Sequence, residues 1–244
     1  MGLSVTVLGC DGSYAGQGGA CSGYLLSSGD THVWLDCGPG TLANLQQHLD
    51  PREISGIVVS HSHPDHWGDL PVGYAAFAYY FDRHSIATYG SSDTRERLIT
   101  AKGGAVDDVY DWHTITDGSE FDIDAFHFRC AVTDHPVETL AVRVEIGSQV
   151  FAYTSDTGSA WPLTALGTGI DLLLCEATFP EDQAGEFAHL TASEAGAAAR
   201  TAGAKRLVLT HLLPGADHEA ARTNAAATFG ADVEIATTNL RIDL

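Results

Sequence analysis

The sequence predicts an α/β protein in which two β-sheets stack face to face with helices on their outer sides. Strand-like apolar runs and helical segments occur together in both halves of the chain, an order that suits such layers. No internal repeat or low-complexity linker divides the 244 residues, so we expect one domain over residues 1–244. Hydrophobic residues make up 44% of the chain, which is enough for a sizeable core and argues against disorder.

The first half of the chain is expected to begin with strands and then to alternate strands with helices. Short apolar runs predict strands at Ser4–Leu8, Gly23–Leu26, Thr31–Leu35, Ile57–Val59 and Ile86–Tyr89. Helices are predicted at Thr41–Leu49, Pro71–Phe81 and Asp93–Thr100. Thr41 is placed to cap the first of these helices, and the second is expected to be buried.

The second half is expected to form a run of strands, then alternating helices and strands. Strands are predicted at Phe126–Ala131, Leu140–Ile146, Val150–Tyr153, Leu172–Leu174 and Leu207–Leu209. Helices are predicted at Thr191–Ala202 and His218–Thr228. Thr191 and Glu194 fit a capping box, in which each side chain accepts a hydrogen bond from the other residue's backbone N–H.

Charge and composition restrict the partners and the location. Lys and Arg number 12 against 32 Asp and Glu, a formal net charge of −20, which repels long nucleic acids because their affinity rests on neutralised phosphates. The longest apolar run, Pro71–Phe81, is too short to cross a membrane, and the N-terminus resembles no signal peptide. Five cysteines without CxxC spacing indicate mostly buried free thiols, so we expect a cytoplasmic protein.

The most informative segment is a histidine-rich sequence that follows the predicted strand Ile57–Val59. Its HxHxDH pattern consists of His61, His63, Asp65 and His66. A shuffled chain of this composition would contain the pattern about 0.002 times, if matches are independent draws. Neutral imidazole and carboxylate are ligands that borderline divalent metals prefer. Because Pro64 disfavours helix at the residue before it, we expect the segment to be a loop at a strand end.

Three further candidate ligands lie where predicted strands end. They are His135, Asp156 and His211. A strand end holds a ligand more rigidly than a free loop does. Each residue alone is compatible with an ordinary polar turn, but together with the first motif they indicate a metal centre.

This order of residues resembles the metallo-β-lactamase superfamily, over nearly the whole chain. The resemblance implies that family's four-layer αβ/βα sandwich and a centre of two divalent metal ions. It implies that one ion is held by His61, His63 and His135, that the other is held by Asp65, His66 and His211, and that Asp156 bridges both. Zinc is the expected metal, and manganese and iron accept the same ligands. An aspartate at this bridging position resembles the hydrolase and phosphodiesterase branches of the superfamily. The true lactamases usually carry cysteine there, so the resemblance disfavours penicillin hydrolysis.

Within the superfamily, several segments resemble the ribonuclease Z branch. They are Tyr153-Thr154-Ser155-Asp156-Thr157, His189-Leu190-Thr191 and Cys175-Glu176-Ala177-Thr178, although cysteine replaces the histidine that begins the last motif in that branch. The corresponding histidine of that branch contacts the scissile phosphate. The resemblance therefore implies that His189 contacts phosphate or protonates the leaving oxygen, and that Asp65 orients an attacking hydroxide shared by the metals.

One departure from ribonuclease Z affects the expected substrate. That enzyme grips transfer RNA with a long arm between the third histidine and the bridging aspartate, whereas only 21 positions separate His135 from Asp156 here. The segments Gly18–Tyr24 and Leu35–Gly40 resemble a compact bacterial subgroup associated with cyclic nucleotide hydrolysis. The resemblance thus implies a small phosphodiester such as a cyclic nucleotide as substrate, and a transfer RNA 3′-processing endonuclease fits less well.

Other interpretations stay open at this point. A hydrolase of small carbonyl esters, lactones or thioesters would use the same metals without a phosphate contact from His189, and a noncatalytic metal or interaction protein is a third class. Candidates to orient the histidine ligands are Asp36, Asp69, Glu176 and Thr178. The aromatic residues Tyr74, Phe77, Tyr80 and Phe81 are expected in the core, and exposed members would suit a homodimer interface.

Overall fold

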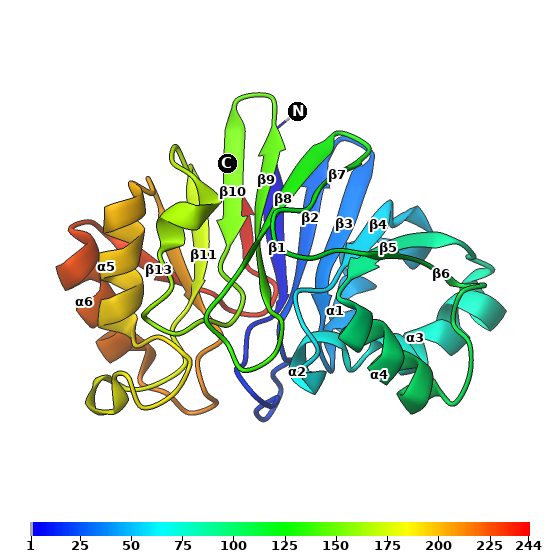
Figure 1. Ribbon diagram of the computed structural model, residues 1–244, viewed down its shortest axis with the longest axis horizontal. Helices are drawn as coiled ribbons and strands as arrows, with labels where there is room; N and C mark the ends of the chain where they lie inside the picture. The colour runs from blue at the N-terminus through cyan, green and yellow to red at the C-terminus, as the bar shows by residue number, and fades with distance from the viewer. Residues whose placement is uncertain (1) are drawn as a thin grey trace.

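The computed structural model describes residues 2–244, which form two seven-stranded β-sheets packed face to face (Figure 1). One group of helices covers the outer face of the first sheet and a second group covers the outer face of the second. The α/β prediction and the four-layer αβ/βα sandwich are therefore confirmed. No helix in the described range is long and apolar enough to cross a membrane.

The first sheet combines the N-terminal half of the chain with its last strand. In order across the sheet, its strands are β14 (Arg241–Asp243), β1 (Ser4–Gly9), β2 (Gly23–Ser28), β3 (Thr31–Cys37), β4 (Gly56–Val58), β5 (Ile86–Gly90) and β6 (Tyr110–Thr114). Strands β3 to β6 are parallel, so their carboxyl ends lie at one edge, the lower edge in Figure 1.

The second sheet contains the remaining strands. In order they are β13 (Val233–Ile235), β12 (Leu207–Thr210), β11 (Leu172–Glu176), β10 (Gln149–Tyr153), β9 (Leu140–Ile146), β8 (Phe126–Val132) and β7 (Glu120–Ile123). Strands β10 to β13 are parallel. The polar residues that follow β10, β11 and β12 therefore meet at a common edge.

Three buried apolar clusters hold the layers together. The central cluster lies between the sheets and includes Val5, Val142 and Phe151. Another packs the first sheet against α1 (Thr41–Leu45), α2 (Pro64–Trp67), α3 (Leu70–Ala76) and α4 (Ser92–Lys102). The third packs the second sheet against α5 (Ala192–Ala202) and α6 (His218–Phe229). The predicted capping box of α5 is confirmed, with hydrogen bonds in both directions between Thr191 and Glu194.

The prediction for the helix at Thr41–Leu49 is wrong in its cap and its length. The helix ends at Leu45, and the residue before it is Gly40, which adopts a φ of 95° that favours glycine. Thr41 donates its hydroxyl to the carbonyl of Gly38 at 2.7 Å. The N-terminus is instead held by the Asp69 carboxylate, which accepts from the N–H of Leu42 at 2.7 Å. A carboxylate from a distant part of the chain has replaced the local cap.

The predicted buried helix at Pro71–Phe81 is helical but buried on one face only. Helix α3 continues into a π-helical turn over Phe77–Phe81. Tyr74 and Phe77 lie in the core as expected, whereas Tyr80 is 83% exposed, so its placement in the core is wrong. The apolar run was too uniform to reveal which face would meet the sheet.

Close contact between α5 and α6 requires a glycine, which gives a test of the packing. A Cβ at Gly196 would lie 2.3 Å from the carbonyl oxygen of Ala225 and from Oγ1 of Thr228. We expect Gly196→Ala to lower the free energy of unfolding by about 1–3 kcal/mol in urea denaturation, as overpacking does. Ala197→Gly on the exposed side of α5 reports helix propensity alone, a loss of about 1 kcal/mol. A Gly196→Ala protein more stable than wild type would contradict this packing.

Candidate metal centre

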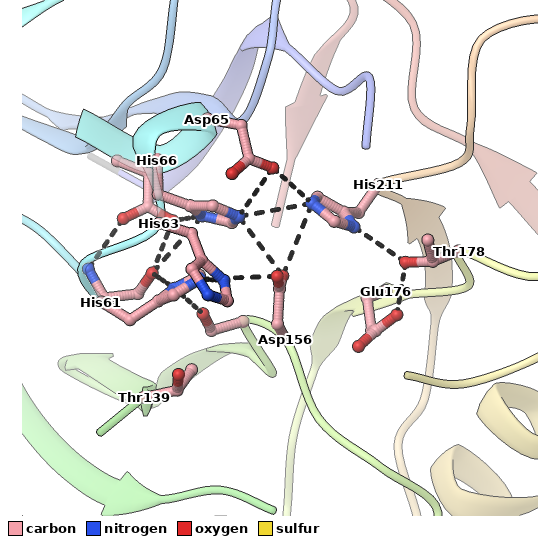
Figure 2. Close-up of polar contacts among 12 residues, drawn as sticks. His61, His63, Asp65, His66, Thr139, Asp156, Glu176, Thr178 and His211 are labelled. Atoms are coloured by element: carbon pink, nitrogen blue, oxygen red, sulfur yellow. Dashed lines mark hydrogen bonds and ion pairs between the residues drawn. The ribbon is translucent and has the colours of Figure 1, made fainter. Parts of the chain in front are cut away.

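The seven predicted ligands converge at the edge where strands of both sheets end, and Figure 2 labels all of them except His135. His61 and His63 follow β4, and Asp65 and His66 lie on α2. The other three follow strands of the second sheet: His135 after β8, Asp156 after β10 and His211 after β12. Residues separated by as many as 150 positions are thus brought together by the stacking of the sheets.

The prediction that the histidine motif is a plain loop is wrong for its second part, since Pro64–Trp67 form one helical turn. His63 keeps the extended backbone that the following proline requires, with φ −75° and ψ 137°. Pro64 then takes the first helical position, where its missing N–H costs nothing. The turn places the side chains of Asp65 and His66 in the cluster.

One group of donor atoms comes from His61, His63, His135 and Asp156. Nδ1 of His63 lies 3.2 Å from Nε2 of His61 and 3.1 Å from Nε2 of His135. Oδ2 of Asp156 lies 3.5 Å from Nε2 of His61 and 3.9 Å from Nε2 of His135. Four donor atoms therefore face a common point from three segments of the chain.

A second group comes from Asp65, His66 and His211, beside the other oxygen of Asp156. Nε2 of His211 lies 3.3 Å from Nε2 of His66 and 3.2 Å from Oδ2 of Asp65. Oδ1 of Asp156 lies 3.3 Å from Nε2 of His66 and 3.6 Å from Nε2 of His211. Asp156 thus presents one carboxylate oxygen to each group.

These donor sets fit divalent metal ions. Ligand atoms about 2.1 Å from a tetrahedral zinc ion lie about 3.4 Å from one another, close to the separations in both groups. Oδ1 of Asp156 is buried and accepts no hydrogen bond within the described residues. A buried carboxylate oxygen without a hydrogen-bond donor is costly unless a cation compensates it. The cluster is therefore compatible with a divalent metal site.

Hydrogen bonds on the far sides of the His135 and His66 rings leave their inward nitrogens free to bind metal. Nδ1 of His135 lies 3.0 Å from the carbonyl oxygen of Ala188, which can only accept, so Nδ1 carries the proton. Nδ1 of His66 likewise donates to Oδ2 of Asp36 at 2.8 Å. In the neutral rings Nε2 is then unprotonated and points into the cluster, as a metal ligand must.

Asp36 is the main support of the first sheet's ligands, as expected for an orienting residue. Its carboxylate is fully buried and also accepts from the N–H and hydroxyl of Ser60, at 2.8 and 2.9 Å, and from the Tyr153 hydroxyl at 3.1 Å. Ser60 and Tyr153 have orienting roles that the sequence did not predict. Ser60 lies beside His61 in the chain, but Tyr153 reaches Asp36 from the other sheet, which no local pattern could show.

Glu176 and Thr178 support the second sheet's ligands. The Thr178 hydroxyl donates to Glu176 at 2.6 Å and therefore accepts from Nδ1 of His211 at 2.8 Å. The buried Glu176 carboxylate lies 3.0 Å from Nδ1 of His189 and accepts the Thr157 N–H at 2.6 Å. This confirms that both residues contact histidines of the site.

His189 lies at the rim of the cluster and is mostly buried, with 16% of its side chain exposed. One of its ring nitrogens lies within 4.8 Å of donor atoms of Asp156 and His211. Burial acts to lower its pKa, but the hydrogen bond and the charge of Glu176 raise the pKa above its usual value. The structure therefore holds a ring that retains its proton more strongly than a free histidine.

Two other predicted residues play no direct part in the cluster. Asp69 holds the N-terminus of α1, so its predicted role as a histidine partner is wrong. Cys175 is buried in the apolar cluster between the second sheet and its helices, which agrees with the loss of the motif's histidine. All five cysteines are free and four of them are buried, as predicted.

The loop that follows β1 contacts two of the predicted ligands. The backbone N–H of Ser13 donates to Oδ2 of Asp65 at 3.0 Å, and Ser13 adopts a φ of 63°. A Cβ at Gly12 would lie 2.4 Å from the carbonyl oxygen of His211, so only glycine fits there. This glycine-rich loop therefore reaches the ligands of both sheets.

The electrostatic balance of the site favours positive charge. Burial acts to lower the pKa of His66, but the surrounding carboxylates, led by that of Asp156, raise it well above its usual value. Burial acts to raise the pKa of Asp156, but the surrounding histidines, led by His211, lower it well below its usual value. The carboxylates therefore stay ionised in a buried site, which metal binding requires.

Comparison with known proteins identifies the family. A family model described as "Beta-lactamase superfamily domain" matches residues 31–212. The chain belongs to the metallo-β-lactamase superfamily. An uncharacterized protein of Mycobacterium tuberculosis is 35% identical over 249 residues, which cover 96% of this chain and 89% of that protein. The probable metallo-hydrolase YhfI of Bacillus subtilis is 32% identical, with coverage of 96% and 97%.

Solved structures agree with this assignment. The crystal structure of the metallo-β-lactamase fold protein YhfI matches with a TM-score of 0.92 and 29% identity over the whole of both chains. The short form of human tRNase Z, at 23% identity, and a diphosphatase from the PhnP family, at 19%, share the fold, each with a TM-score of 0.78 and coverage of 98% or more of both chains. A ribonuclease Z of Haloarcula marismortui is 26% identical, with coverage of 87% and 86%. The chain is a metal-dependent hydrolase of this superfamily, and it is similar to ribonuclease Z proteins.

The role of Asp36 can be tested with a side chain of nearly the same size and shape. Asn tolerates the φ of 56° at this position, and Asp36→Asn keeps the size of the side chain while it removes the charge that holds His66 and replaces one acceptor oxygen with an NH2 donor. We expect zinc affinity to fall by about 10- to 100-fold, as measured by competition with a chromogenic chelator. Asp122→Asn is the matched control, because Asp122 contacts His127 at the same 2.8 Å distance on the surface. Equal losses in both variants would refute a specific role for Asp36.

Proposed function

We propose that the protein is a phosphodiesterase that binds two divalent metal ions, and that these ions are zinc. Its proposed substrate is a small phosphodiester such as a cyclic nucleotide. The observation that carries the proposal is the position of His189, a ring held by a buried carboxylate at the rim of two donor groups that share Asp156. A phosphodiester needs a charged centre for its oxygens and a proton for its leaving oxygen, and this arrangement suits both needs.

The proposed ligands divide as the donor atoms do. His61, His63 and His135 would hold one ion, Asp65, His66 and His211 would hold the other, and Asp156 would bridge them. Divalent ions held by these residues would supply a nucleophile by lowering the pKa of water, and would neutralise phosphate oxygens. Asp65, fixed by the N–H of Ser13, would also orient the attacking oxygen toward phosphorus.

In this proposal His189 serves the leaving group. Its Nδ1 faces Glu176, so the other ring nitrogen is the one available to the substrate. The raised pKa keeps a proton on this ring at neutral pH more often than on a free histidine. As the bond from phosphorus to the leaving oxygen breaks, that nitrogen would give its proton to the oxygen, and the Glu176 charge would favour reprotonation of the ring.

The interval between His135 and Asp156 argues against a transfer RNA substrate. Strands β9 and β10 fill it, joined by a turn at Gly147 and Ser148, so the described chain has no inserted arm there. The net charge of −20 disfavours a long polyanion as well. Small phosphodiesters meet neither obstacle.

A substrate panel tests this function against the carbonyl alternative. Purified, zinc-loaded protein is assayed with cyclic AMP, bis(p-nitrophenyl) phosphate, a lactone and a thioester. We expect turnover of the phosphodiesters, its loss after chelation, and its return when zinc is restored. Faster turnover of the lactone or thioester, with no phosphodiester cleavage, would assign the same centre to carbonyl hydrolysis and reject the proposal.

Replacement of His189 tests the proton donor. We expect His189→Ala to lower kcat for phosphodiesters by about 100- to 10,000-fold, the range of general acid catalysis, with the bound zinc unchanged. Metal content is measured on the same samples, so a loss of metal is distinguished from a loss of chemistry. His218→Ala, an exposed histidine at the start of α6, serves as control. Unchanged turnover in His189→Ala would remove this residue from the mechanism.

A further inference from the structure

Two phenylalanines lie beside His189 on the segment that leads from β11 to α5. The rings of Phe179 and Phe187 are stacked, with centroids 4.6 Å apart and an interplanar angle of 21°. Phe179 also meets His189 edge to face, at 5.5 Å between ring centroids and 65°. Phe187 is 52% exposed, so the outer ring of the stack faces solvent. An aromatic surface therefore continues outward from the proposed proton donor.

Phe187 stacks on Phe179 with one face and leaves about half of its side chain to solvent, at 52% exposure. A large apolar side chain that is half exposed loses much of its burial energy, and the neighbouring loop positions Glu186 and Gly185 are polar or small and also exposed. Phe179 already packs against the rings of His189 and Phe187. The outer face of Phe187 is therefore the face of the stack that a ligand could still cover. A ligand ring that stacks on Phe187 would complete the arrangement, since aromatic side chains bind planar groups in this way.

The surrounding segments indicate that the group bound there is uncharged. No lysine or arginine occurs in residues 10–22, 59–69, 133–139, 154–171, 177–191 or 211–217, the segments that carry or contact the proposed ligands. Arg97 on α4 is paired with Asp93 at 2.8 Å. The segment with the two phenylalanines carries acidic groups instead, at Glu181, Asp182 and Glu186. These segments therefore offer a substrate no cationic side chain for further phosphates.

We infer that Phe187, backed by Phe179, is a specificity-determining residue that stacks with an uncharged planar ring of the substrate, the position of a nucleobase in a nucleotide. This inference rests on the proposed function and narrows its substrate class to phosphodiesters that carry such a ring. Stacking on one aromatic side chain tolerates every base, because each base offers a flat face. The site therefore selects for the presence of a base more than for its identity.

Equilibrium binding tests the inference apart from catalysis. The probes are AMP and ribose 5-phosphate, which share the sugar and the phosphate and differ by the base, titrated into zinc-loaded protein in a calorimeter. We expect wild-type protein to bind AMP about tenfold more tightly, the effect of one stacked base. Phe187→Ala should abolish that difference and leave ribose 5-phosphate affinity unchanged, and Phe187→Tyr should retain it.

Controls make each outcome decisive. Tyr79→Ala removes another exposed ring, 81% exposed on the π-helical turn, and should leave the preference for AMP intact. Metal content and melting temperature of Phe187→Ala establish that the fold and the centre are retained. Equal affinity of wild-type protein for the two probes, or a preference that survives in Phe187→Ala, overturns the inference. Absence of phosphodiester turnover with a Phe187-dependent preference for AMP would instead refute the proposed reaction and keep the ring subsite.

Discussion

The centre depends on one kind of interaction, a hydrogen bond on the outward nitrogen of a histidine. A neutral imidazole binds a cation only through a nitrogen that carries no proton, so the far nitrogen must be fixed as the donor. The carbonyl of Ala188 fixes it in His135, Asp36 in His66, and the Thr178–Glu176 pair in His211. Without these acceptors the same side chains could converge in tautomers unable to share an ion.

Two buried carboxylates, one from each sheet, help to fix the protonated nitrogens of these histidines. Asp36 is the residue before the last of β3 in the first sheet, and Glu176 is the last residue of β11 in the second. Asp36 also accepts from Tyr153 of the second sheet, so one hydrogen bond joins the two halves directly behind the ligands. Stacking of the sheets and formation of the centre are therefore coupled, and a change that separates the sheets also disturbs the histidines.

The sequence predicted the parts of the site that are local and the strands that are strongly apolar. The four residues of the HxHxDH motif lie within six positions, so their proximity needed no knowledge of the fold. The convergence with His211 and the support from Tyr153 depend on sheet stacking, which periodicity does not encode. Strand β14 has three residues with exposed flanks, and it was missed because pairing with β1 defines it. The homodimer, the cytoplasmic location and the single domain over residues 1–244 stay predictions.

In the segment from β11 to α5, the residues that support the histidines of the site and the residue proposed to select the substrate lie close together but are distinct. Thr178 near the start of the segment contacts His211, and His189 near its end contacts Glu176, the last residue of β11; both Glu176 and Thr178 are buried. Phe187 lies between Thr178 and His189 on an exposed stretch that makes none of those hydrogen bonds. Substitutions there can alter which ring is bound while the ligands keep their partners, because the ends of the segment are fixed independently by the sheet and by the capping box of α5. A rigid centre with a variable aromatic rim would allow one arrangement of ligands to serve different phosphodiesters.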